Sequence, residues 1–143
     1  MVMGTRNAAL EPFATRVCGL RVLSPDRVVV LAPRATSAQA IANLNQNGEV
    51  SVCASWPRNF RTLQIKGQSL QIADGTPEDR EVCERQLQDF CDAVVQFGIT
   101  RAQSRNLWLF DVWRVEIQVT SIFEQTPGPG AGRRLGVEAG RRG

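Results

Sequence analysis

The chain has 143 residues, which is enough for one domain with a sizeable hydrophobic core. It contains no histidine, which excludes a Ser-His-Asp triad, a Cys-His pair and every histidine-ligated zinc site. The net charge of +3 arises in residues 133–143, which hold four arginines and one acid, whereas the other thirteen bases and thirteen acids cancel. The folded part is therefore neutral, and we expect neither nucleic acid nor a membrane as a partner.

Four cysteines, Cys18, Cys53, Cys83 and Cys91, stand far apart in the sequence and form no C-x-x-C pair. Without such a pair, and without histidine, we expect no metal site. The first six residues lack the apolar run and cleavage site of a secretory signal. We therefore expect a cytoplasmic protein whose thiols stay reduced and serve as small core residues.

The first half of the chain indicates strands around one short helix. Residues 2–3 predict a short edge strand, and residues 13–23 predict one long strand that forms a hairpin with residues 28–32. Either Thr36 or Ser37 is expected to cap a helix from residue 38 to about 46, which ends at Asn47-Gly48. A further strand over residues 50–56 then ends at a proline.

Residues 61–72 predict a long central strand with a bulge at Gly67. Leu63 and Ile65 share one face, but the apolar positions after the glycine fall on the other. Such a phase slip is typical of a β-bulge, which bends a strand around the corner of a barrel. The strand also carries Lys66, the only lysine in the chain, which is either a functional cation or a surface residue on a solvated face.

The second half predicts a longer helix and a closing strand. Thr76 begins a helix that runs to about residue 97 and ends at Gly98, and residues 100–106 predict one helical turn. Residues 107–123 alternate cleanly and predict the last strand, after which a Pro/Gly arm is expected to leave the sheet. The sequence thus indicates a mainly β (α+β) fold, a six-stranded antiparallel split β-barrel with two peripheral helices in residues 1–125. Residues 126–143 are expected to form a flexible arm and basic tail.

The order of these motifs resembles a known family. A hairpin leads to a Ser/Thr-capped helix with the pair Asn43-Leu44, a V-x-V strand follows at residues 50–53, and an R-x-x-x-(I/V)-x-G strand follows at residues 61–67. The chain is therefore similar, over residues 4–125, to the FMN-binding split barrels of the pyridoxamine 5′-phosphate oxidase-like family. The resemblance implies a homodimer with two FMN sites at the subunit interface, and a flavin-dependent oxidoreductase of unknown substrate.

The resemblance also implies which residues hold the cofactor. Phosphate is expected near the start of the short helix and the first hairpin, and the flavin ring beside the central strands. No protein base is needed, because the flavin itself carries the redox chemistry. The residues at the matching positions, together with Arg34 as a substitute cation, are Arg16, Arg34, Thr36, Ser37, Arg61, Thr62 and Lys66.

One departure from the family pattern leaves an alternative open. Ala38-Gln39-Ala40 follows Ser37 at positions where relatives that hold FMN firmly carry Arg or Lys, so two charge-assisted phosphate contacts are missing. The alternative is a non-catalytic dimeric split barrel that binds flavin, F420, haem or another planar ligand. Trp56, Trp108 and Trp113 would then line a planar pocket or, as is more usual for tryptophan, pack in the core or at an interface.

Overall fold

The structure is a computed structural model that describes residues 1–136, and one antiparallel sheet forms its centre. The strands follow the order β2-β1-β5-β6-β7-β4-β3, and β8 pairs with β7 off this path. They are β1 (Val2–Arg6), β2 (Pro12–Arg16), β3 (Gly19–Ser24), β4 (Arg27–Pro33), β5 (Glu49–Ser55), β6 (Thr62–Asp74), β7 (Val112–Glu124) and β8 (Arg134–Leu135). The expected antiparallel, mainly β architecture with helices is confirmed. The expected count of six strands is wrong, since the described residues form eight.

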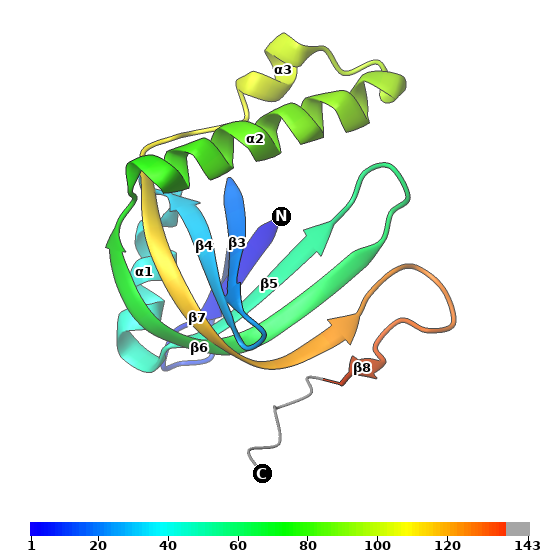
Figure 1. Ribbon diagram of the computed structural model, residues 1–143. Helices are drawn as coiled ribbons and strands as arrows, with labels where there is room; N and C mark the ends of the chain where they lie inside the picture. The colour runs from blue at the N-terminus through cyan, green and yellow to red at the C-terminus, as the bar shows by residue number, and fades with distance from the viewer. Residues whose placement is uncertain (137–143) are drawn as a thin grey trace.

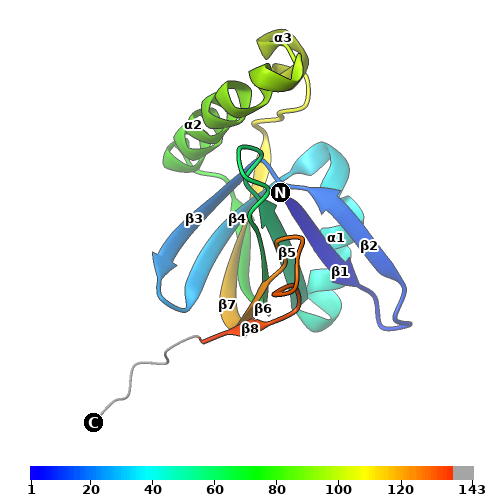
Figure 2. The same ribbon diagram turned by 90° about the vertical axis from the view of Figure 1, so that its right-hand side faces the viewer.

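The two long strands β6 and β7 pair along their whole length and carry the curvature of the sheet (Figure 1). Their register shifts between Lys66 and Gly67, which confirms the expected bulge, and shifts again between Ser69 and Gln71. Each extra residue bends the strand and increases its twist. As a result, β3 and β4 diverge from β1 and β2, as the side view in Figure 2 shows.

The main hydrophobic core lies inside this curved sheet and is completed by one helix. Alternate residues of the strands point into it, as expected for a sheet with one buried face. The buried members are Met3, Val17, Val28, Val30, Ala32, Ala40, Leu44, Val50, Val52, Val115, Ile117 and Val119.

The single strand expected over residues 13–23 is wrong, because the structure divides it into β2 and β3 at opposite ends of the strand order. The break falls at Val17 and Cys18, which are both buried, so the chain here crosses the molecule instead of alternating between two faces. The amide of Cys18 donates to the carbonyl of Leu31 at 2.8 Å, which fixes the start of β3 beside β4. The strand expected at residues 2–3 is β1, and it lies between β2 and β5 rather than at an edge.

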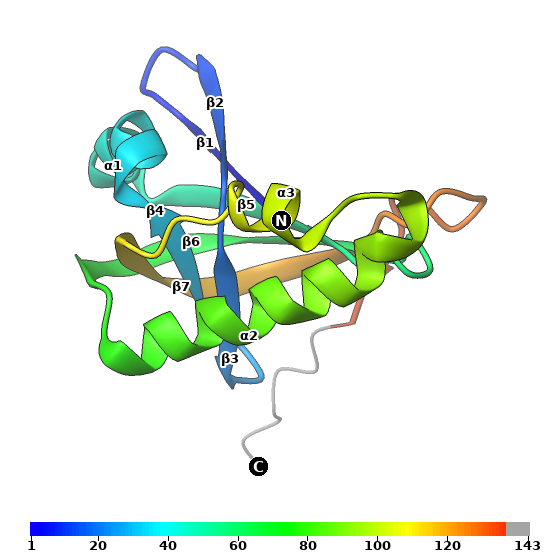
Figure 3. The same ribbon diagram turned by 90° about the horizontal axis from the view of Figure 1, so that it is seen from above.

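Within residues 1–136, four helical segments surround the sheet: α1 (Arg34–Asn47), α2 (Pro77–Val94), the 3-10 turn η1 (Val95–Phe97) and α3 (Arg101–Arg105). The expected start of α2 is confirmed, since Thr76 and Asp79 form a reciprocal capping box. The expected helix ends at Gly48 and Gly98 are also confirmed, and both glycines adopt a left-handed φ. Seen from above in Figure 3, α2 runs across the sheet beside β3.

The expectation that Thr36 or Ser37 caps α1 is wrong. The helix starts at Arg34, directly after β4, with Pro33 as its N-cap residue and no side-chain cap. Ser37 thus lies inside the first turn, is fully buried, and donates its hydroxyl to the carbonyl of Pro33. A serine that bonds a carbonyl four residues back is common within helices, so its presence alone does not mark a cap.

The Pro/Gly arm after β7 turns back to the sheet rather than leaving it. The amide of Gly132 donates to the carbonyl of Glu124 at 2.7 Å, and the amide of Glu124 donates to the carbonyl of Arg133 at 2.9 Å. The strand β8 then pairs with the end of β7 through Leu135 and Ile122. The expected basic tail lies, from residue 137 onward, outside the described residues. Within residues 1–136, no helix combines the length and apolar character needed to cross a membrane.

Gly67 tests the role of the bulge. A Cβ atom at this position would lie 2.1 Å from the backbone carbonyl oxygen of Gln118 on the paired strand, and that oxygen cannot move without disturbing the ladder. We expect Gly67→Ala to lower the free energy of unfolding by about 3 kcal/mol, as overpacking does. The matched control is Gly4→Ala in β1, where the nearest atom is 3.9 Å away. Equal stability of the two variants in urea unfolding would contradict this role.

Candidate functional site

The start of α1 is open to an anion. No side chain caps this helix end, and its first turn contains no acidic residue. Thr36 is exposed there, and the hydroxyl of Thr15 on β2 lies 3.4 Å from the hydroxyl of Thr36. Unpaired backbone amides and the helix dipole favour negative charge at such an end. The amide of Arg34 already donates to the carbonyl of Asp111 at 2.9 Å, so the suitable chemistry at the sequence-predicted phosphate position lies in Thr36 and the later amides of the first turn.

Arg34, at the same helix end, already has partners. Its guanidinium pairs with Asp74 at the end of β6 and with Asp111, 3.0 Å away, and it stacks over the ring of Trp113 at 3.7 Å. Two carboxylates compensate its single charge, so Arg34 offers little attraction to a phosphate as it stands. Both carboxylates are largely exposed, which makes the pairs weak individually.

Arg16 and Lys66 share the outer face of the sheet, opposite the core. Directly paired residues of antiparallel strands point to the same side. Two adjacent rows of such pairs cross β2, β1, β5 and β6: Arg16, Val2, Cys53 and Gln64 form the first, and Ala14, Gly4, Ser51 and Lys66 form the second. Arg16 thus points away from Thr36, and Thr15 is the residue of β2 that faces α1.

Small side chains leave a shallow groove of about 640 Å³ on this outer face, with Gly4, Ala14 and Ser51 among its lining residues. Lys66 lies at this groove, exposed, with its Nζ 5.2 Å from the centre of the Phe123 ring. The direction of Lys66, which the sequence left open, is therefore outward. Arg6 and Glu49 form an ion pair of 2.7 Å along the same groove.

Arg61 and Thr62 lie at the opposite end of β6 from Arg34. The hydroxyl of Thr62 lies 2.9 Å from that of Ser55, and its amide donates to Thr126 at 3.0 Å. Hydrogen bonds from the hydroxyl and amide of Thr126, with the nearby charge of Arg61, hold the pKa of Glu124 below its ordinary value. Thr62 marks one end of β6 and Asp74, the partner of Arg34, the other, so up to about 40 Å of strand separates the two groups.

The structure therefore divides the predicted ligands into three places within one chain. Arg34, Thr36 and Ser37 stand at the start of α1, Arg16 and Lys66 on the outer face, and Arg61 and Thr62 at the far end of β6. Thr15 is the contributor that sequence reasoning missed. The sequence signal for Thr15 would have been the end of β2 at Arg16. A strand that ends there points Thr15, and not Arg16, toward the helix.

A second concave feature lies between two parts of the sheet, which we call its wings. One wing is the pair β3–β4, and the other is the pair β5–β6. This inter-wing cavity has a volume of about 640 Å³ and is roofed by α2. Trp56 and Trp108 line it, whereas Trp113 does not, since it stacks on Arg34. Its other lining residues are Met1, Leu20, Val22, Ser24, Pro25, Val28, Ala54, Ser55, Pro57, Arg58, Leu63, Ile65, Gln86, Asp89, Phe90, Ala93, Val119 and Ile122.

The cysteines form no reactive or metal-binding group in the part of the chain that the structure describes. All four are free, and no cluster of three or more Cys, Asp and Glu side chains that could hold a metal ion lies within residues 1–136. Burial raises the pKa of the Cys83 thiol to about 12, and burial also raises that of Cys18. Both thiols therefore stay protonated near neutral pH and serve as core residues.

Comparison with solved structures identifies the fold. HupZ of Group A Streptococcus superposes with a TM-score of 0.56 at 15% identity, covering 92% of this chain and 87% of HupZ. A "putative pyridoxamine 5'-phosphate oxidase" from Lactobacillus delbrueckii superposes with a TM-score of 0.52 at 12% identity, covering 85% and 81%. The chain has the fold of pyridoxamine 5′-phosphate oxidase-related proteins. No family model and no curated protein matches its sequence.

At such low identity, this pyridoxamine 5′-phosphate oxidase-related fold says nothing by itself about ligands or activity. An FMN-binding protein from Syntrophomonas wolfei is also similar, with a TM-score of 0.48 at 12% identity over 85% of this chain and 74% of that one. The superpositions on HupZ and on the Lactobacillus delbrueckii protein confirm the family resemblance seen in the sequence as a likeness of fold.

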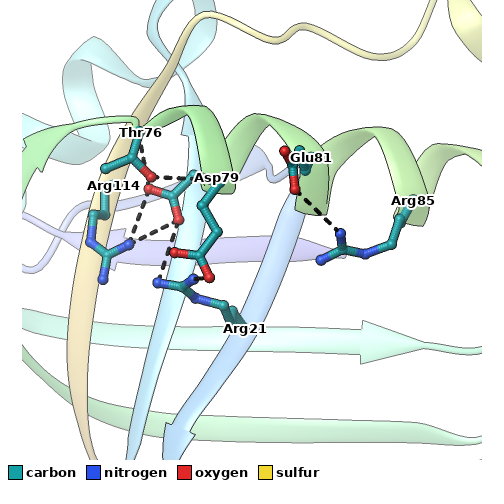
Figure 4. Close-up of polar contacts among 7 residues, drawn as sticks. Arg21, Thr76, Asp79, Glu81, Arg85 and Arg114 are labelled. Atoms are coloured by element: carbon teal, nitrogen blue, oxygen red, sulfur yellow. Dashed lines mark hydrogen bonds and ion pairs between the residues drawn. The ribbon is translucent and has the colours of Figure 1, made fainter.

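A buried ion cluster joins α2 to the sheet and is structural rather than catalytic (Figure 4). Asp79 is fully buried, accepts two hydrogen bonds of 2.8 and 3.0 Å from Arg114 on β7, and lies 3.8 Å from Arg21 on β3. Its burial would raise its pKa, but hydrogen bonds from Thr76 and Arg114 outweigh burial and hold that pKa below the ordinary value. Every oxygen of Asp79 is therefore occupied in tying α2 to both β3 and β7.

Replacing Asp79 with Asn should remove the charge that holds the two arginines. We expect Asp79→Asn to lower the free energy of unfolding by about 3 kcal/mol at pH 7. Because the folded-state pKa is lowered, this stability is complete above the ordinary pKa near 4 and is lost as pH falls through the lower folded value. The gap between wild type and variant should therefore shrink from pH 5 toward pH 2, measured by urea unfolding.

Glu81→Gln is the matched control for the Asp79 variant. Glu81 lies two residues after Asp79 on α2 and is largely exposed. It pairs only loosely with Arg85, at 3.9 Å (Figure 4). Its loss should change stability by less than about 0.5 kcal/mol. A gap between wild type and Asp79→Asn that did not depend on pH would refute the role of the Asp79 charge.

Proposed function

We propose that this protein binds FMN and acts as a flavin-dependent oxidoreductase with a sheet of the split-barrel type. The observation that carries the proposal is the uncapped start of α1, where exposed Thr36 stands beside Thr15 with no acid in the first turn. The fold shared with the Lactobacillus delbrueckii protein supports it. FMN would supply the hydride or electron transfer, and the protein would bind and orient it.

In this proposal, the start of α1 holds the phosphate through the Thr36 hydroxyl and the first-turn amides. Ser37 contributes only position, since its hydroxyl is occupied by Pro33. Arg16, Lys66 and Arg61 are the exposed cations near which an anionic flavin can settle, and Thr62 supplies a polar contact to its ring. Arg34 becomes a phosphate ligand only when Asp74 and Asp111 release it.

We also propose a homodimer whose cofactor sites lie between protomers. The start of α1, where Arg34 pairs with Asp74, and the Arg61–Thr62 turn lie at opposite ends of the 13-residue strand β6. Two protomers related by a two-fold axis can bring the α1 end of one against the β6 end of the other. The symmetry creates two such contacts, and therefore two cofactor sites. The four free cysteines support a reducing location, which we take to be the cytoplasm.

A second candidate is a non-catalytic dimeric protein that binds flavin, F420, haem or another planar ligand. Two observations favour it: Arg34 is neutralised by carboxylates, and residues 38–40 supply no cation beside the helix start. Trp56 and Trp108, which line the inter-wing cavity, provide flat apolar surfaces of the kind such ligands use. Under this second candidate, the protein would have no oxidoreductase substrate.

FMN titration tests flavin binding, and turnover of the bound flavin separates the two candidates. For a flavin protein, FMN should remain with the protein through gel filtration, with its visible absorption bands, and should raise the melting temperature. Thr36→Val should weaken FMN binding severalfold, since it removes the exposed hydroxyl that the proposal places at the phosphate. Arg105→Gln on α3 should change nothing.

The opposite result has a distinct meaning for each ligand. A melting temperature that ignores FMN but rises with haem or F420 would replace the flavin proposal with the second candidate. Unchanged FMN affinity in both Arg16→Gln and Lys66→Ala would show that the outer face plays no part in binding. Reduction of bound FMN by NADH or NADPH with turnover, rather than binding alone, is what the oxidoreductase proposal requires.

A further inference from the structure

The inter-wing cavity has a lining that suits an apolar ring. Aliphatic side chains of both wings face one another across it, Leu20 and Val28 from one wing and Leu63 and Ile65 from the other. The space is open to solvent at one end, and its volume of about 640 Å³ lies within the range of small-molecule sites. Side chains left without contacts there favour an occupant.

The polar groups at the inner end of the cavity already have hydrogen-bond partners within the protein. Trp108 donates its indole N–H to the carbonyl of Cys18 at 2.9 Å, and its ring lies 5.2 Å from that of Phe90 on α2. Gln86 uses both ends of its amide on the backbone of Leu20, at 2.7 and 3.1 Å. Its polar groups are thus already satisfied, and what remains is a fixed aromatic wall against which a flat ring can pack.

The mouth of the cavity has charged side chains on the turn between β5 and β6 and on the facing side of α2, and Ser24 lines the cavity from the end of β3. Arg58 on the turn and Asp89 on α2 are the only residues of this lining with charged side chains, and neither forms an ion pair within the part of the chain that the structure describes. The turn is strained, since Phe60 adopts a left-handed φ of 56°. The Phe60 ring lies 6.3 Å from that of Phe97 and its amide donates to the carbonyl of Trp56, which fixes the turn beside the cavity.

We propose that the inter-wing cavity is a separate binding site for an aromatic anion of two or three fused or linked rings. The rings lie between the wings against Trp108 and Phe90, and the anionic group reaches Arg58, whose guanidinium fork matches a carboxylate or sulfonate. Asp89 opposes a second negative charge, so the site selects monoanions. None of the seven predicted flavin ligands lines this cavity, and the site therefore stands independently of the FMN proposal.

The test uses a pair of fluorescent probes that share their rings and differ in charge. The anionic probe is 1-anilinonaphthalene-8-sulfonate, and the neutral probe is N-phenyl-1-naphthylamine. Both should bind the protein without added flavin, with energy transfer from tryptophan. Arg58→Gln should weaken the anionic probe about tenfold, and Asp89→Asn should tighten it severalfold, while neither variant changes the affinity for the neutral probe.

A cavity-filling variant and a matched control complete the design. Ala54→Phe places a ring inside the cavity from β5 and should abolish binding of both probes. Arg85→Gln on α2, which does not line this cavity, should leave both affinities unchanged. The melting temperature of each variant shows that it is folded.

Three results would overturn the proposal. The first is probe binding that survives Ala54→Phe in a folded protein. The second is equal loss of both probes in Arg58→Gln, which would mean that the arginine supports the turn and not an anion. The third is a dimer in wild type that Ala54→Phe converts to a monomer, which would show that a second copy of the chain fills the cavity.

Discussion

The close approach of β7 to Gly67 is the constraint on which the rest of the structure depends. The carbonyl of Gln118 lies where a side chain at residue 67 would begin, so only glycine lets the two long strands stay paired through the bend. That bend separates the sheet into its two wings and gives it an inner and an outer face. The bend therefore sets three positions. The cavity and α1 lie on the inner side of the curved sheet, and the groove lies on its outer side.

The same curvature explains why one chain does not gather its predicted cofactor ligands. The start of α1 follows β4, whereas Arg61 and Thr62 begin β6, and the length of that strand lies between them. The buried cluster of Asp79, Arg114 and Arg21 fixes α2 over the cavity and leaves none of its charges for chemistry. The exposed cations that the two proposals use are Arg16, Lys66 and Arg61 on the sheet and Arg58 at the mouth of the cavity.

The sequence predicted those features that depend on neighbours along the chain. The bulge at Gly67, the helix start at Thr76 and the helix ends at Gly48 and Gly98 are each set by a few adjacent residues, and each is confirmed. Features that depend on distant partners could not be predicted. The break at Val17 and Cys18 interrupts an alternating pattern because of contacts with β4, and Arg34 looked free because its partners, Asp74 and Asp111, are remote in sequence. Pro33, already paired in β4, starts α1 before its better capping residues are reached.

The central claim is that two copies of this chain form each FMN site together, because the predicted ligands at the start of α1 and at the Arg61–Thr62 end of β6 are separated within one copy. Native mass spectrometry of the protein with FMN tests it most directly, because it counts chains and ligands in the same ion. We predict a dimer that carries two FMN molecules, with no monomer that carries one. A monomer that binds FMN by itself, or a dimer that binds none, would contradict the account.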